Sequence, residues 1–246
     1  MNEKKTTATF FKTSHSSITT LKLFKTKDRV IETQNSSKFL GIYLDESMKW
    51  DAHITQLCTN LSSVCFSLKE MEKYFNWSTL KVVYLAVFES RLRYASMFFG
   101  NSSFMKNVNV LQKRALRIIL RLKYDASCRG KFREMSILTA TAIHIQESLL
   151  FVFKNYQQFE QNTTSAYNIR TTFLKYPKHR LTHTEKGPEY SCVRYYNALP
   201  LSIRSQRNLS KYKSSVFKLL VHNEPYNIGE FFDYCRVLVR EKTIHI

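Results

Sequence analysis

Carboxylates able to support nucleotide chemistry are few in this sequence, and their spacing is not that of a catalytic site. The five aspartates stand at positions 28, 45, 51, 125 and 233 and are never adjacent. Two-metal phosphoryl or nucleotidyl transfer needs carboxylates that converge on the metal ions. The nearest approximation is Asp45-Glu46 with Asp51, which we interpret as solvated acids at the end of a strand and the start of a helix. The sequence therefore predicts no catalytic residues and no enzyme activity of this chain on its own.

One group of residues has a spacing that could suit a metal ion. His179 and His183 are four residues apart and Cys192 follows them, but a fourth ligand is lacking and Lys178 and Arg180 would repel a cation. We interpret these histidines as part of a basic surface. The five glycines lie at least 30 residues apart, which excludes a glycine-rich phosphate loop. We expect neither a metal nor a cofactor.

Positive charge is the strongest chemical feature of the chain. Lys and Arg number 38 against 19 Asp and Glu, a net charge of +19, and residues 105–135 alone carry nine cations against two acids. Lys113, Arg117 and Arg121 step by four along a predicted helix, and Arg114 lies beside them. A row of cations on one helix face is the arrangement needed to follow a phosphate backbone.

A second basic block covers residues 170–218 and holds 11 Lys and Arg against two Glu. It includes Lys178 and Arg180, which we take as further candidate contacts. Tyrosines are interleaved with its cations, among them Tyr176, Tyr190, Tyr195 and Tyr196. Aromatic rings beside Arg can stack on bases.

Together the two blocks predict binding of RNA or an RNA–DNA duplex with low sequence specificity. The alternative is that both are solvated charged surfaces of a structural or protein-interaction fragment. An anionic membrane surface is disfavoured as a partner, because the amphipathic helices are needed for the core.

The elements that hold these residues follow from composition and periodicity. A content of 43% apolar residues is enough for a core, and five Gly and four Pro favour long helices over turn-rich β folds. Strand-forming residues occur at 8–11, 19–24, 29–31 and 38–44 and predict a small antiparallel element. Apolar residues then recur at helical spacing over 52–72, 79–93 and 108–122, with Ser78 as the expected cap of the second helix. Further helices are expected over 137–156 and 214–222, with an irregular basic stretch over 176–196.

We therefore predict a mostly α protein with three parts. These are a small β element at 1–48, a helical bundle at 49–123, and a basic, mainly helical region at 124–246. Residues 1–20 lack the apolar run of a signal peptide and no window approaches 18 apolar residues, so we expect an intracellular protein, nuclear or cytoplasmic, that is not secreted. The five cysteines never form C-x-x-C, and we expect reduced packing residues.

Several short blocks of residues follow one another along the chain in a defined order. They are Asn2-x-x-Lys5-Thr6 followed by Phe11, Lys38 to Asp45, Met48-x-Trp50-x-x-His53-Ile54, Tyr94-Ala95 before Phe98-Phe99-Gly100, Leu111-Gln112-Lys113-Arg114-Ala115 with Ile118-Ile119, and Tyr196-Asn197-x-Leu199-Pro200-x-x-Ile203-Arg204. In order and spacing these blocks resemble the end of the palm, the thumb and the C-terminal region of jockey-type non-LTR retrotransposon reverse transcriptases, which are RNA-directed DNA polymerases.

The resemblance implies roles for two regions. Lys38, Phe39, Leu40 and Gly41 would belong to the strand–turn region that grips the primer end, and residues 50–123 would form a thumb-like bundle that holds the template–primer duplex. The family's catalytic Tyr/Phe-x-Asp-Asp motif and its endonuclease lie N-terminal to the Asn2 motif and do not occur in this sequence. The resemblance therefore implies a piece of a transposable-element polymerase, and a polymerase portion completed in trans by a separate palm is a further alternative.

Overall fold

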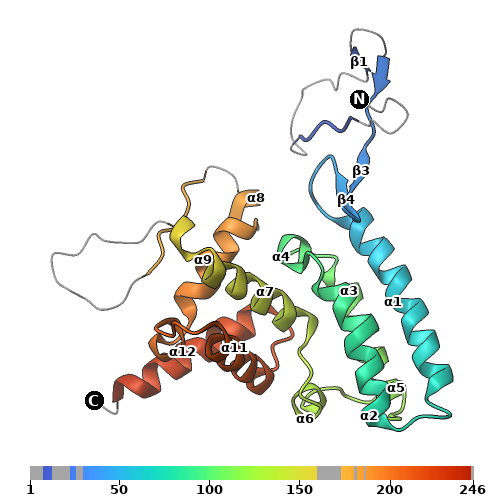
Figure 1. Cartoon of the computed structure of the whole chain (residues 1–246), viewed down its shortest axis with the longest axis vertical. Coiled ribbons are helices and arrows are strands. Elements are labelled where there is room, and N and C mark those ends of the chain that lie inside the picture. The colour runs from blue at the N-terminus through green and yellow to red at the C-terminus, as the bar shows by residue number, and fades with distance from the viewer. Residues whose placement is uncertain are drawn as a thin grey trace.

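A computed structural model describes residues 8–12, 23–25, 30–159, 173–179, 182–185 and 187–244, most of which are helical (Figure 1). The predicted fold class, mostly α with a small N-terminal antiparallel β element, is confirmed. The strands are β1 (Leu23–Lys25), β2 (Val30–Glu32), β3 (Ser36–Phe39) and β4 (Ile42–Asp45). The N-terminal helices are α1 (Asp51–Met71), α2 (Trp77–Val83), the π-helix η2 (Tyr84–Glu89), α3 (Ser90–Arg93), α4 (Ser96–Phe99) and α5 (Met105–Ile119). The remaining helices are α6 (Lys131–Glu134), α7 (Ala140–Lys154), the 3-10 helix η3 (Tyr156–Gln158), α8 (Thr182–Glu185), α9 (Pro188–Ala198), α10 (Leu201–Arg204), α11 (Leu209–Asn223) and α12 (Ile228–Ile244).

Two short hairpins form the β element: β1 pairs with β2 and β3 pairs with β4, both antiparallel. The single strand expected over 38–44 was wrong, because the chain reverses at Leu40 and Gly41, where φ is +48° and +82°. Positive φ at both central residues is the turn geometry that matches the twist of a two-residue hairpin. The strand expected at 8–11 is reduced to one bridge between Ala8 and Thr33, and residues 19–22 lie outside the described part.

The Asp45 carboxylate fixes the path of the chain from the hairpin into α1. It is buried and accepts hydrogen bonds from Ser47 Oγ, Lys49 N and Trp50 N at 2.8, 2.9 and 2.8 Å. These bonds hold Trp50 at a φ of +69°, a costly conformation for a residue with a side chain. Our interpretation of Asp45 as a solvated acid was therefore wrong, since three donors replace water, whereas Asp51 is exposed in the first turn of α1 as expected.

The N-terminal helices pack along the stripes that the sequence predicted. The buried side of α1 packs mainly against α5. The helix expected over 79–93 is one continuous helical segment, α2–η2–α3, with a π turn in the middle. Its cap is Asn76, whose Oδ1 accepts from Thr79 N at 3.0 Å, and not Ser78, whose hydroxyl donates to the same oxygen. Helix α5 ends at Ile119 and not at residue 122, because Arg121 takes a φ of +53°.

The C-terminal helices differ from the sequence prediction mainly in extent. Helix α7 lies within the expected range 137–156 and begins after Thr139, whose Oγ1 accepts from Ala142 N at 3.1 Å. Helix α11 is longer than expected because Asn208 caps it, accepting from Lys211 N at 3.1 Å. The stretch expected to be irregular contains most of α9, with Pro188 at its first position. None of the described helices is both long and apolar enough to span a membrane.

Helix α7 lies between the N-terminal and the C-terminal helices (Figure 1). It contacts α3, α4 and α5 as well as α9 and α11. One hydrophobic core therefore runs from α1 to α12 across residue 123. The five cysteines are free thiols, and four of them are buried in this core.

A buried histidine links α7 to the helices on both sides. His144 Nδ1 lies 3.0 Å from the Ser96 carbonyl oxygen, and Nε2 lies 3.2 Å from the Tyr195 hydroxyl. The same hydroxyl lies 2.8 Å from Asn101 Oδ1. His144 is fully buried, and loss of solvation lowers its pKa to about 4. The imidazole is therefore neutral in the folded protein near pH 7.

We predict that Asp45→Asn lowers the free energy of unfolding at pH 7 by about 1–3 kcal/mol, because hydrogen bonds to a charged acceptor are lost. Burial raises the pKa of Asp45, but the bonds from Lys49, Ser47 and Trp50 together outweigh burial and hold it below its ordinary value. The wild-type protein should therefore have a higher unfolding free energy than Asp45→Asn above about pH 4. This difference should shrink as the pH falls through the folded-state pKa of Asp45. Urea denaturation at pH 7 and pH 3 measures this, with the exposed Asp125→Asn as control. Equal losses in both variants would contradict the prediction.

A second prediction concerns acid sensitivity. The His144 pKa is depressed in the folded state, so the stability from keeping it neutral is fully present above about pH 6.5 and falls between pH 6.5 and about 4, by about 3 kcal/mol in total. His144→Gln should flatten the dependence of unfolding free energy on pH in this window, as measured by chemical denaturation. The exposed His222→Gln should keep the wild-type slope; an unchanged slope in His144→Gln would refute the assignment.

Candidate nucleic-acid interface

Three cations from two segments of the chain line one hollow of about 280 Å³, which we call the cationic pocket. Lys113 and Arg117 lie one turn apart on α5, and Arg129 lies in the loop before α6. The other lining residues are Ser127, Cys128 and Tyr226. Tyr226 comes from the turn between α11 and α12, so the pocket is complete only when that turn packs against α5.

The ring of Tyr226 organises the cationic pocket. The Lys113 ammonium and the Arg129 guanidinium each lie 4.6 Å from the centre of this ring, within the range of cation–π attraction. Glu224 holds the ring in place: its Oε1 accepts from the Tyr226 hydroxyl at 3.0 Å, and both of its oxygens accept from Gly130 N at 3.0 and 2.7 Å. Burial and this hydrogen bond raise the pKa of Tyr226, so the hydroxyl stays neutral.

The charges in the cationic pocket are only partly neutralised. The Arg129 guanidinium faces Glu230, with two N···O distances of 3.3 Å. Arg117 Nε donates to the Ala126 carbonyl at 2.8 Å, which orients the side chain without cancelling its charge. No carboxylate of the described residues lies within 4.0 Å of a Lys113 or Arg117 side-chain nitrogen. An anion entering this pocket would therefore meet two cations that form no ion pair with a carboxylate of the described residues.

The expected row of three cations along one helix is broken after Arg117. Because α5 ends at Ile119, Arg121 leaves the helix and its Nη2 donates to the carbonyls of Glu72 and Phe75 at 2.8 and 3.3 Å. Arg121 therefore stabilises the turn between α1 and α2 by binding its carbonyls, a role that its sequence position did not indicate. Arg114 is exposed.

The other predicted contacts lie elsewhere. Lys38 to Gly41 form the exposed end of the β3–β4 hairpin, with the Lys38 ammonium 5.4 Å from the centre of the Tyr43 ring. Lys178 is exposed, and Arg180 lies outside the described residues. The hairpin leads into the first residue of α1, whereas Arg121 binds carbonyls just beyond the last residue of α1. The two ends of this 21-residue helix are about 31 Å apart. The structure therefore does not bring the primer-grip-like residues and Arg121 together.

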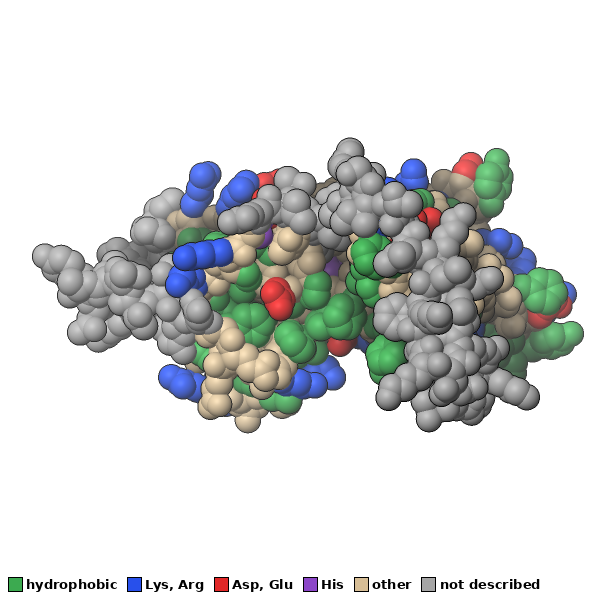
Figure 2. Space-filling model, turned by 90° about the horizontal axis from the view of Figure 1, so that it is seen from above, with side chains coloured by type: hydrophobic (Ala, Val, Ile, Leu, Met, Phe, Trp, Pro, Cys, Tyr) green, Lys and Arg blue, Asp and Glu red, His purple; other side chains and the backbone are tan. Residues whose placement is uncertain are grey.

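Cations are not gathered on every face of the molecule. Figure 2 shows the molecule from above, turned by 90° from the view of Figure 1. On this face the described Lys and Arg side chains lie mainly around the edge of the molecule, and hydrophobic side chains lie between them. The described Lys and Arg side chains on this face therefore do not form one gathered patch.

The histidines considered as metal ligands have other surroundings. His179 Nε2 lies 3.0 Å from Glu185 Oε1. Cys192 is fully buried, and burial raises its pKa to about 12. The side chain of His183 lies outside the described residues. Within the part of the chain that is described, no group of three or more His, Cys, Asp and Glu residues could hold a metal ion.

Sequence reasoning missed Arg129, Ser127 and Tyr226 as parts of one pocket. Arg129 belongs to the basic block over 105–135, but it lies in a loop where no helical period marks it. Tyr226 is nearly one hundred residues further along the chain, and no local pattern indicates that it contacts α5.

Comparisons of this chain with models of protein families, with curated proteins and with solved structures find no match. The interpretation of the site therefore depends on its own geometry and charge.

The structural role of Arg121 can be separated from its charge. Arg121→Lys keeps the charge but loses the planar fork that reaches two carbonyls, and we predict a loss of about 1 kcal/mol in unfolding free energy. The matched control is Arg114→Lys, an exposed position where the same change should cost less than about 0.5 kcal/mol. Urea denaturation of the two variants measures the difference, and equal stability would show that the Arg121 contacts contribute nothing.

Proposed function

We propose that the chain binds RNA or an RNA–DNA duplex through phosphate contacts, with the cationic pocket as the anchoring contact. The observation that carries this proposal is a preformed hollow with three cations, two of which have no carboxylate partner among the described residues. A phosphate group gains charge-assisted hydrogen bonds from ammonium and guanidinium groups, and the Ser127 hydroxyl is a further donor in the same hollow. Contacts of this kind position a nucleic acid without reading its sequence.

The pocket is held in shape before any ligand binds. The Tyr226 ring and the Glu224 carboxylate keep Lys113 and Arg129 apart and oriented. An incoming phosphate would compete with Glu230 for the Arg129 guanidinium. Arg129 and Glu230 form an exposed ion pair, which is a kind of pair that contributes little to stability. The cost of opening this pair is therefore small compared with the gain from three cations.

We also propose, from the sequence blocks, that the chain is related to the thumb and C-terminal region of jockey-type non-LTR reverse transcriptases. Two residues of these blocks have structural roles in the fold. Gln112 makes three buried hydrogen bonds, and the Asn197 side chain pairs with both backbone groups of Leu174 at 2.9 Å.

On this proposal the chain binds and does not catalyse. Among the described residues, Asp45 is the only aspartate at a buried position, and its carboxylate accepts from backbone and hydroxyl donors. An intracellular location, in the nucleus or the cytoplasm, follows from an RNA partner.

The test is the salt dependence of binding. For a structured RNA, log affinity should fall linearly with log salt, and Lys113→Gln together with Arg117→Gln should make the slope shallower by about one to two units, because each lost phosphate contact releases fewer counterions. Fluorescence anisotropy over 50–300 mM KCl is a suitable measurement. Circular dichroism checks folding, since Arg117 also bonds to Ala126.

A matched control separates the pocket from net charge. Lys154→Gln and Arg133→Gln together remove the same charge from exposed positions on α7 and α6, and this variant should keep the wild-type slope within error. If the two double variants change the slope equally, the pocket has no special role; if neither RNA nor hybrid duplex binds at low salt, the proposed function is wrong.

A further inference from the structure

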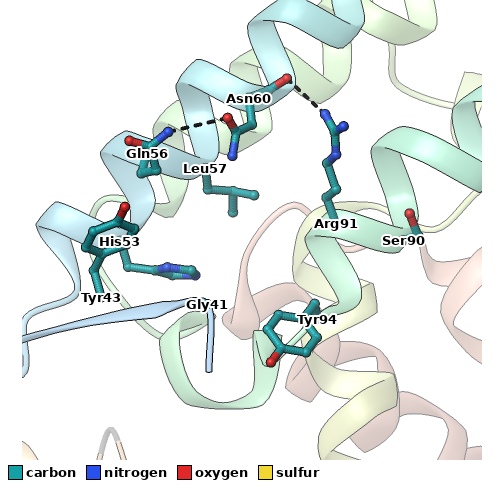
Figure 3. A pocket seen from close by; sticks show the side chains of 9 residues that line it. All are labelled: Gly41, Tyr43, His53, Gln56, Leu57, Asn60, Ser90, Arg91 and Tyr94. Carbon is teal, nitrogen blue, oxygen red and sulfur yellow. Dashed lines mark hydrogen bonds between the residues drawn. The ribbon is translucent and has the colours of Figure 1, made fainter. Parts of the chain in front are cut away.

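A second hollow, of about 330 Å³, lies where the β3–β4 hairpin meets α1 and α3 (Figure 3). It shares no residue with the cationic pocket. The hydroxyl of Tyr94, at the end of α3, donates to the Leu40 carbonyl at 2.6 Å and attaches the hairpin turn to the helices. The hairpin turn and the end of α3 lie more than fifty residues apart in the sequence, and together with α1 they line the hollow. We call it the hairpin pocket.

The floor of the hairpin pocket is apolar apart from the His53 ring, whose nitrogens have no hydrogen-bond partner among the described residues. Leu57 and His53 are both buried, with exposures of 6% and 7%. The His53 ring packs on Phe99, with 4.7 Å between ring centres, and neither ring nitrogen has a hydrogen-bond partner in the structure. Burial lowers the pKa of His53, so the ring is neutral at pH 7. An unpartnered polar ring costs stability that an apolar side chain would not. Because both ring nitrogens are closed off from solvent, His53 contributes to the pocket as part of its floor and not as a hydrogen-bonding group.

One wall of the hairpin pocket carries a pair of amides. Gln56 Nε2 donates to Asn60 Oδ1 at 3.4 Å, so Gln56 Oε1 remains as an acceptor and Asn60 Nδ2 as a donor. A donor and an acceptor side by side match the edge of a nucleobase, which presents the same alternation. In Figure 3 these two side chains lie on the α1 side of the pocket.

The opposite wall carries a cation. Arg91 extends from the α3 side, and its Nη1 donates to the Asn60 carbonyl at 3.4 Å (Figure 3). No carboxylate of a described residue pairs with this guanidinium. Tyr43 and Tyr94 add two aromatic rings to the lining. An apolar floor, paired amides, aromatic rings and a cation without a carboxylate partner among the described residues together suit a planar, hydrogen-bonding ligand that carries a negative charge.

We propose that the hairpin pocket takes one unpaired nucleotide of a bound RNA, with its base over Leu57, its edge on Gln56 and Asn60, and its phosphate at Arg91. This inference rests on the proposed function and adds a preference to it. A volume of about 330 Å³ lies at the small end of ligand pockets and suits one nucleotide but not a duplex. Unpaired bases in loops and bulges are free to enter such a site, whereas a paired base must first leave its stack.

The experiment compares two RNA hairpins that differ by one unpaired 2-aminopurine nucleotide in the stem. We expect the full chain to bind the bulged RNA about tenfold more tightly than the fully paired RNA, the effect of one or two net hydrogen bonds to the edge of the base. The 2-aminopurine fluorescence should change on binding. Gln56→Ala with Asn60→Ala should remove most of this difference while leaving affinity for the paired RNA unchanged.

The matched control is Gln157→Ala with Gln158→Ala, which removes two exposed amides in η3 and should preserve the tenfold preference. Arg91→Gln serves as a second variant and should reduce the preference by at least threefold.

Equal affinity of wild type for both RNAs, or a preference that survives all pocket variants, would overturn the inference. Binding that needs the bulge and has a salt slope of only about one unit, the value for the single Arg91 contact, would support the hairpin pocket and refute the phosphate anchor. Salt-dependent binding without preference would do the reverse.

Discussion

Helix α7 has to be buried on nearly every side, and the positions of the other helices follow from this requirement. Ala142, Ile143, Ile145 and Ser148 are all fully buried, although at 100° per residue they point in different directions around the helix. A helix of this kind cannot lie on a surface. Helices α3, α4 and α5 therefore cover one side of it and α9 and α11 cover another, so that the N-terminal and C-terminal helices share one core.

Burying α7 also takes polar groups away from water, and hydrogen bonds between the helices replace water for Gln112 and Arg93. Gln112 Nε2 donates to the Tyr84 hydroxyl and the Leu138 carbonyl, and its Oε1 accepts from Ala140 N. Arg93 links α3 to α7 by donating to Glu89, Gln146 and Glu147. The same packing explains Gly100, where a Cβ would lie 2.3 Å from the His144 ring.

The two candidate sites form where this core brings distant segments together at the surface. The cationic pocket needs the turn between α11 and α12 to lie against α5, and the hairpin pocket needs the β3–β4 turn to bond to Tyr94. Under the two proposals the pockets have different roles. The cationic pocket supplies charge that binds any phosphate, and the hairpin pocket supplies amides and rings that select an unpaired base. Both depend on side chains whose own hydrogen bonds are to backbone carbonyls, such as Arg117 and Tyr94.

The sequence by itself determined the helices of the first half, the small β element and the absence of a long apolar span, because hydrophobic period and turn residues are local properties. It also placed Lys113 and Arg117 on one helix face. It did not determine where α5 ends or that Arg121 binds the α1–α2 turn, because both depend on carbonyls supplied by residues 72 and 75. Asp45 likewise became a buried acceptor through the tight turn that follows it. Tyr226 and the hairpin pocket required the folded core, since contacts between segments fifty to one hundred residues apart leave no periodic trace in the sequence.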